Sequence, residues 1–137
     1  YVNSFKQQDS AQGELIEQVD TVGVPQFRTT LSADWRQDVF SASLVSKYID
    51  STRDCAPLDV QVGDPGCDEN VSSFTTWDGQ FGWDAPWGGE IVAGVRNLFD
   101  TQPPISNFLR GATDSGVDFT LYDIEGRVPF VRYTQSF

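Results

Sequence analysis

Few residues in the sequence have the types and spacing that catalysis requires. None of the 137 residues is a histidine, so the commonest general base and the commonest metal ligand are both missing. No nucleophile elbow, phosphate-binding glycine loop or His/Cys metal cluster occurs. Carboxylate pairs are frequent, but 20 acidic residues against 9 basic ones produce such pairs by composition alone. We therefore expect no enzymatic activity, no cofactor and no metal site.

The two cysteines are the residues with the clearest chemistry. Cys55 and Cys67 lie in a polar stretch rich in Asp, Pro and Gly. A cytosolic enzyme could carry both as free thiols, but two cysteines that flank such a loop fit a disulfide in an oxidising compartment better. Closing a loop of this size would stabilise the fold by on the order of 3 kcal/mol.

Two other groups could bind a ligand. Trp77, Trp83 and Trp87 could form a platform on which sugar rings stack. Acidic residues in the stretch that holds the cysteines could bind a divalent ion, but they lack EF-hand spacing and a solvated acidic loop is the favoured interpretation. These acidic residues are Asp64, Asp68 and Glu69.

The net charge of -11 argues against nucleic-acid binding, which needs a basic face. Four arginines fall at polar positions of alternating segments, where we expect them to pair with neighbouring acids. Contact with an anionic ligand remains an alternative. These arginines are Arg28, Arg36, Arg96 and Arg132.

Strict alternation of apolar and polar residues is the main structural signal. In residues 27–36 the odd positions are mostly apolar and the even positions polar, which is the period of a strand with two different faces. Gln37-Asp38 provides a tight turn, and residues 39–49 repeat the alternation. Further strands are expected at residues 71–84, 90–99 and 126–137, and residues 1–6 resemble the end of an earlier strand.

The expected connections alternate in length. Residues 50–70 and 100–125 form long loops, a third joins residue 6 to about residue 24, and the turns at 37–38 and 85–89 are short. The sequence thus predicts an all-β, antiparallel up-and-down meander of five to six strands. Transmembrane barrels have short turns on one side of the membrane and long loops on the other.

Aromatic spacing agrees with a membrane barrel. Phe27 and Trp35, like Phe40 and Tyr48, are separated by a strand length of about 27 Å, or about 20 Å along the membrane normal when tilted. This is close to the ~25 Å apolar band that aromatic girdles flank. The expected girdle residues are Phe27, Trp35, Phe40, Tyr48, Trp83 and Phe137.

Three segments resemble the C-terminal strands of TonB-dependent outer-membrane receptors. Residues 94–100 read Gly-Val-Arg-Asn-Leu-Phe-Asp and precede Pro103-Pro104, as in the family's penultimate strand. Tyr122-Asp123 and residues 126–132, leading to Phe137, resemble the last strand. Residues 24–28 with the following hairpin also fit. Gln135 departs from the family pattern, because it stands where an aromatic or aliphatic residue is usual.

The resemblance implies that residues 1–137 form the C-terminal part of a barrel whose plug and N-terminal strands are absent. The sequence begins at Tyr1 and contains no methionine, so we expect a processed chain or a fragment. The family imports scarce nutrients such as siderophore-iron, cobalamin or oligosaccharides across the bacterial outer membrane, energised by the TonB complex through the plug. The resemblance also implies contact with outer-membrane lipid, arginines that face the lumen, and a terminal Phe137 that the barrel-assembly machinery recognises. The rival interpretation is a secreted β-sandwich that binds carbohydrate.

Overall fold

The computed structural model describes residues 1–8, 15–17, 19–55 and 69–135. The chain forms two compact units. One unit comprises residues 29–48, 75–102 and 125–137 and contains the main sheet, and the other comprises residues 1–28, 49–74 and 103–124.

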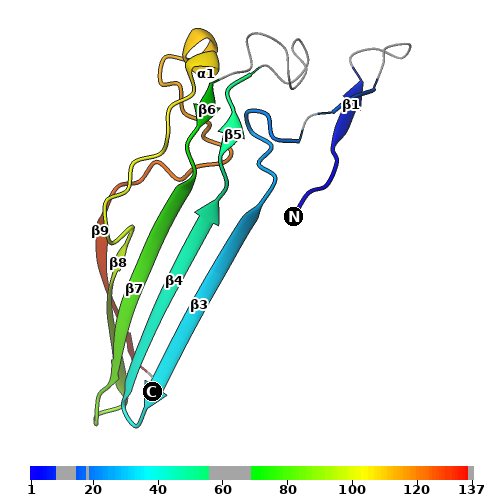
Figure 1. The fold of residues 1–137 in the computed structure, drawn as a ribbon. Coiled ribbons are helices and arrows are strands. Elements are labelled where there is room, and N and C mark those ends of the chain that lie inside the picture. The colour runs from blue at the N-terminus through cyan, green and yellow to red at the C-terminus, as the bar shows by residue number, and fades with distance from the viewer. Residues whose placement is uncertain (9–14, 18, 56–68, 136–137) are drawn as a thin grey trace. The chain divides into compact units, whose positions relative to one another are not determined.

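The main sheet has five strands in the order β3-β4-β7-β8-β9 (Figure 1). Each strand pairs with the next strand of this sheet along the chain, with β5 and β6 lying in the connection from β4 to β7. The sheet is an antiparallel meander, as the sequence predicts. It is open, and within the described residues β3 and β9 are its edge strands. The strands are β3 (Arg28–Gln37), β4 (Phe40–Ile49), β7 (Phe74–Asp84), β8 (Gly89–Arg96) and β9 (Val128–Gln135).

The register confirms the two faces expected from the alternation. Gly82 of β7 lies opposite Val92 of β8, which lies opposite Arg132 of β9. One residue along, Ile91 lies between Trp83 and Tyr133, on the other face of the sheet. We call the face of Arg132 the polar face and the face of Tyr133 the apolar face.

Short turns join β3 to β4 and β7 to β8, at the same end of the sheet (Figure 1). The first turn falls at 38–39, one residue later than predicted, and Asp38 adopts a φ of 51°. In the second, the amide of Ala85 donates to the carbonyl of Gly89 at 2.7 Å, and Gly88 has a φ of 82°. Residues of these types tolerate the left-handed conformation that such turns need.

Two predicted strand boundaries were wrong. The strand predicted at 90–99 ends at Arg96, because Asn97 takes a φ of 48° and leaves the extended conformation. The strand predicted from residue 71 begins at Phe74, because β6 (Asn70–Val71) pairs instead with β5 (Thr52–Arg53).

The other unit contains structure that the sequence did not predict. The expected strand at residues 1–6 is wrong, because pairing begins only at Lys6, where β1 (Lys6–Gln8) meets β2 (Leu15–Glu17). A short helix, α1 (Asn107–Ala112), interrupts the predicted loop at 100–125. Its N-cap is Ser106, whose side chain accepts a hydrogen bond from the amide of Leu109. No described helix is long and apolar enough to cross a bilayer.

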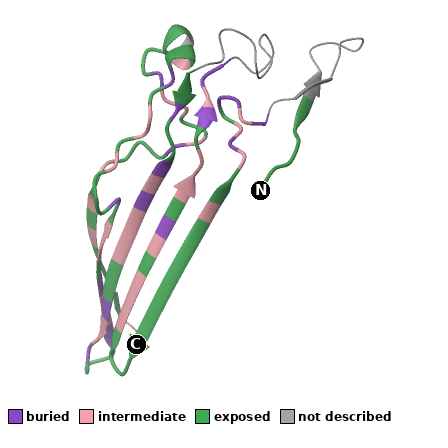
Figure 2. Cartoon of the chain, in the orientation of Figure 1, coloured by how far each residue is buried: buried purple, intermediate pink, exposed green. Residues whose placement is uncertain are grey.

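The buried apolar side chains are distributed unequally between the units. The unit with the helix buries several, and Phe74 meets Tyr122 edge to face with ring centroids 5.4 Å apart. Among the described residues of the main-sheet unit, only Ala85 and Val92 are buried apolar residues. Figure 2 shows β3 exposed over most of its length. The buried apolar residues of the unit with the helix are Val19, Val22, Cys55, Val71, Phe74 and Tyr122.

Candidate functional site

The apolar face of the main sheet carries large side chains that are open to solvent. Leu31 of β3 is 67% exposed, Phe81 of β7 is 49% exposed and Val131 of β9 is 75% exposed. In water a surface of this kind is costly, and monomeric soluble proteins rarely keep a large contiguous one. The large exposed residues of this face are Leu31, Trp35, Phe40, Leu44, Phe81, Val131 and Tyr133.

Aromatic rings gather near the short turns. Phe40 stacks on Phe81 with ring centroids 5.8 Å apart, and Trp83 meets Trp87 edge to face at 5.5 Å. The Nε1 of Trp87 donates to the hydroxyl of Tyr133 at 3.4 Å. Rings that combine an apolar body with a polar tip are typical of membrane–water boundaries.

Gln135, the departure from the family pattern, is part of the same cluster. The hydroxyl of Tyr133 donates to its Oε1, and its Nε2 donates to the carbonyl of Trp87 at 3.5 Å. Its carboxamide is therefore hydrogen-bonded on both sides, which makes a polar residue tolerable at this position.

The structure describes five of the six predicted girdle residues. Trp35 and Phe40 are exposed and flank the first short turn, while Trp83 is half-buried beside the second. Phe27, 39% exposed, immediately precedes β3 and Tyr48 lies near the end of β4, so these two belong to the opposite ends of their strands. Phe137 lies outside the described residues, and its roles in the girdle and in assembly stay predictions.

The polar face carries ion pairs between strands. Arg36 of β3 meets Asp84 of β7 at 2.6 Å, and Lys47 of β4 meets Asp78 of β7 at 2.9 Å. Arg96 at the end of β8 meets Glu125 at 2.8 Å. The predicted pairing of arginines with neighbouring acids is thus confirmed for Arg36 and Arg96. Each of these pairs is partly exposed and contributes at most about 1 kcal/mol.

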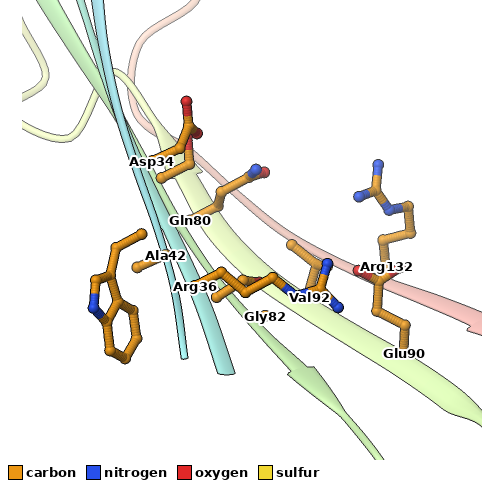
Figure 3. Close-up of a pocket in the computed structure, with 11 residues that line it drawn as sticks. Asp34, Arg36, Ala42, Gln80, Gly82, Glu90, Val92 and Arg132 are labelled. Atoms are coloured by element: carbon orange, nitrogen blue, oxygen red, sulfur yellow. The ribbon is translucent and has the colours of Figure 1, made fainter. Parts of the chain in front are cut away.

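The other two predicted arginines occupy the same face. Arg132 lies opposite Val92 in the register, and Arg28 begins β3, an even number of residues from Arg36. A shallow hollow of about 270 Å³ lies at this face, and Arg36, Gln80, Glu90 and Arg132 line it from four different strands (Figure 3). The hollow is mixed in charge, so it favours neither an anion nor a cation.

The remaining sequence candidates are only partly described. Cys55 is buried, with 2% of its surface exposed, and Cys67 lies outside the described residues, so the disulfide between them stays a prediction. Of the acidic ion-site candidates, Asp64 and Asp68 also lie outside. Glu69 accepts a hydrogen bond from the Nδ2 of Asn107 at 2.6 Å. The part of the chain that the structure describes contains no group of three metal-ligating side chains.

The tryptophans do not form a flat platform. The rings of Trp83 and Trp87 are inclined by 88° to each other, whereas a sugar ring stacks best on an open, flat aromatic face. Trp77 is half-buried within β7.

Sequence reasoning missed two buried polar residues that organise the loops. Asp54, 8% exposed, accepts hydrogen bonds from the hydroxyl of Ser106 and the amide of Asn107, both at 2.5 Å. Asn97, 5% exposed, bonds to the backbone of Thr101. Asn97 lies in the motif of residues 94–100, whereas nothing in the sequence around Asp54 points to a partner 52 positions away.

No family model matches the chain, and no curated protein or solved structure matches it either. The most distinctive feature of the described residues is a two-faced sheet whose apolar side carries exposed large side chains.

Proposed function

We propose that this chain is the C-terminal part of the β-barrel of a TonB-dependent receptor in the bacterial outer membrane. The receptor would take up a scarce nutrient, such as siderophore-bound iron, cobalamin or an oligosaccharide. The observation that carries the proposal is the exposed apolar face of a sheet that buries almost no apolar side chains of its own.

The contrast between the two units supports this interpretation. The unit with the helix buries valines and aromatic rings, as a part surrounded by water must. In the sheet, Leu44 is 40% exposed and Tyr133 is 55% exposed, and no described residues form a second layer that covers them. Hydrocarbon tails of lipids would remove this face from water at no cost in polar contacts.

The polar face is consistent with a wet barrel interior. Charged pairs such as Arg36–Asp84 keep considerable exposure on both partners, which a water-filled lumen allows and a packed protein core does not. The alternation of short turns with long connections, now present in the meander, also agrees with a transmembrane barrel.

The wider partners follow from the resemblance to the receptor family. The TonB complex would act through a plug outside residues 1–137, and the barrel-assembly machinery would recognise the C-terminal strand with Phe137. The rival carbohydrate-binding β-sandwich has no specific observation in its favour, since it needs a second sheet against the apolar face and an open aromatic platform.

Fractionation of cells that express the full-length product tests the proposal. We expect the protein in the outer-membrane fraction, from which detergent but not high salt extracts it. An appreciable soluble periplasmic pool of folded protein would contradict the proposal. Residues 1–137 expressed alone should aggregate, because an open sheet exposes both apolar surface and unpaired strand edges; a soluble, folded monomer would instead favour the rival.

A further inference from the structure

The turn after β8 combines two left-handed residues with several side-chain hydrogen bonds. Asn97 has a φ of 48° and Asp100 has a φ of 56°, so both adopt the left-handed conformation that Asn and Asp tolerate better than other non-glycine residues. The amide of Asp100 donates to the carbonyl of Asn97 at 2.9 Å. We call residues 97–100 the Asn97 turn.

The side chain of Asn97 closes the turn on itself. Its Oδ1 accepts from the amide of Thr101 at 2.8 Å, and its Nδ2 donates to the carbonyl of Thr101 at 2.9 Å. The amide of Asn97 in turn donates to the Oδ1 of Asp78 at 2.9 Å, which ties the turn to β7. Because Asn97 is almost fully buried, losing these partners would leave polar groups without water to replace them.

The Asn97 turn also forms hydrogen bonds with the residues that lead into β9. The Nδ2 of Asn97 also donates to the carbonyl of Glu125 at 3.4 Å, and the Oδ1 of Asp100 accepts from the amide of Arg127 at 2.8 Å. A Cβ on Gly126 would lie 2.8 Å from the Oδ1 of Asp100, so a larger residue there would push this carboxylate aside. The backbone from residue 125 to 127 is thus held directly before β9 begins.

We propose that the Asn97 turn sets the register in which β9 pairs with β8, with Asn97 and Asp100 as the positioning residues. The observed register places Arg96 opposite Val128, and the held amide of Arg127 lies one residue before that pair. A slip of one residue would exchange the two faces of β9, and a slip of two would keep the faces but break the contact of Asp100. This proposal is independent of whether the sheet lies in a membrane.

Cross-strand cysteine pairs in the full-length protein measure the register directly. Ala93 lies opposite Val131, and directly opposed antiparallel residues are within disulfide reach. The pair A93C with V131C therefore reports the native register, and A93C with Y133C reports a slip of two residues. Cross-links are scored only in protein that has been assembled and has resisted protease, by mass spectrometry of unreduced peptides.

The two turn substitutions to add to each cysteine pair are Asn97→Gly and Asp100→Gly. Glycine keeps the left-handed backbone and removes the side-chain hydrogen bonds. Combined, we expect the two substitutions to lower the native cross-link at least about twofold and to produce the slipped one. Asp100→Asn keeps an acceptor for Arg127 and should retain the native pattern. Asp114→Ala, an exposed position in the same long connection, is the control.

Two results would overturn the proposal. In one, the Asn97→Gly, Asp100→Gly protein keeps the native cross-link at the parental yield. In the other, less protein assembles but the assembled fraction keeps the native register, which would assign the turn to stability alone. Either result would show that other contacts determine the register, such as the packing of the Phe130 ring over Gly94.

Discussion

The carboxylate of Asp54 accepts a hydrogen bond from the hydroxyl of Ser106 at 2.5 Å, although the two residues are 52 positions apart in sequence. The same carboxylate accepts from the amides of Asn107 and Phe108, so it joins the segment after β5 to the first turn of α1. Hydrogen bonds therefore join two connections, distant in sequence, within one unit.

Loss of the hydrogen bonds to Asp54 should make α1 open more often. Asp54→Ala leaves the buried Ser106 hydroxyl and two amides without their acceptor, at a cost of about 1–3 kcal/mol. We expect limited trypsin digestion to cleave after Arg110 faster in this variant than in the parent protein. Asp114→Ala serves as the control and should digest at the parental rate. Equal digestion of all three proteins would show that α1 does not depend on Asp54.

Alkaline conditions should act on the unit with the helix through Tyr122. Burial raises the pKa of this phenol, and the negative charge of Asp118 raises it further. Because the pKa is higher in the folded state, the contribution of the neutral phenol to stability is present below about pH 10 and is lost as pH rises through the folded value.

Tyr122→Phe removes this titration together with a buried hydroxyl for which the described residues provide no partner. We expect the melting temperature of the variant to fall less than that of the parent between about pH 9 and about pH 11. Tyr1→Phe, at a position that is 75% exposed, should behave like the parent. The idea fails if all three proteins lose the same number of degrees.

The predicted disulfide has a direct chemical test. Unreduced peptides of the protein isolated from cells should contain Cys55 linked to Cys67, and reduction should lower the stability of the fold by on the order of 3 kcal/mol. Mass spectrometry of alkylated protein settles the question. Free thiols at both positions would contradict the predicted disulfide.

The two faces of β4 should respond differently to a new charge. Leu44 belongs to the apolar face, and its neighbour Ser43 lines the hollow on the polar face. Leu44→Arg should cost about 2–4 kcal/mol if the side chain meets the middle of a bilayer and should reduce the amount of assembled protein in the outer membrane. Ser43→Arg is the matched control and should leave assembly near the parental level. A similar loss from both substitutions would contradict the two-faced interpretation.

The strands could be predicted from the sequence because their signal is local. Alternation in residues 27–36 and 39–49 reflects two different environments on the two sides of each strand, and it placed β3 and β4 to within a residue or two. The ends of strands depend on single residues that leave the extended conformation. Asn97 is an example, since its left-handed backbone is fixed by bonds to Asp78, Thr101 and Glu125 that no short window reveals.

The structure of the long connections could not be predicted for the same reason. α1 has only six residues, too few to form without tertiary support. Its N-cap Ser106 has a recognisable residue type, but the helix is held by Asp54, which is distant in sequence. Alternation alone placed the candidate arginines on the polar face of the sheet. The partners of Arg36 and Arg96, Asp84 and Glu125, depend on the strand register and on the fold of the connection.

Whether the apolar face of the sheet meets lipid is tested most directly by spin labels on adjacent residues of β3. Leu31→Cys and Ser32→Cys place a label on opposite faces of the same strand, in the full-length protein reconstituted into bilayers, with the parent protein treated identically as the blank. Oxygen concentrates in hydrocarbon, whereas a charged nickel chelate stays in water. We predict that the label at position 31 collides mainly with oxygen and the label at 32 mainly with the chelate. Equal access of the chelate to both labels would contradict a membrane barrel.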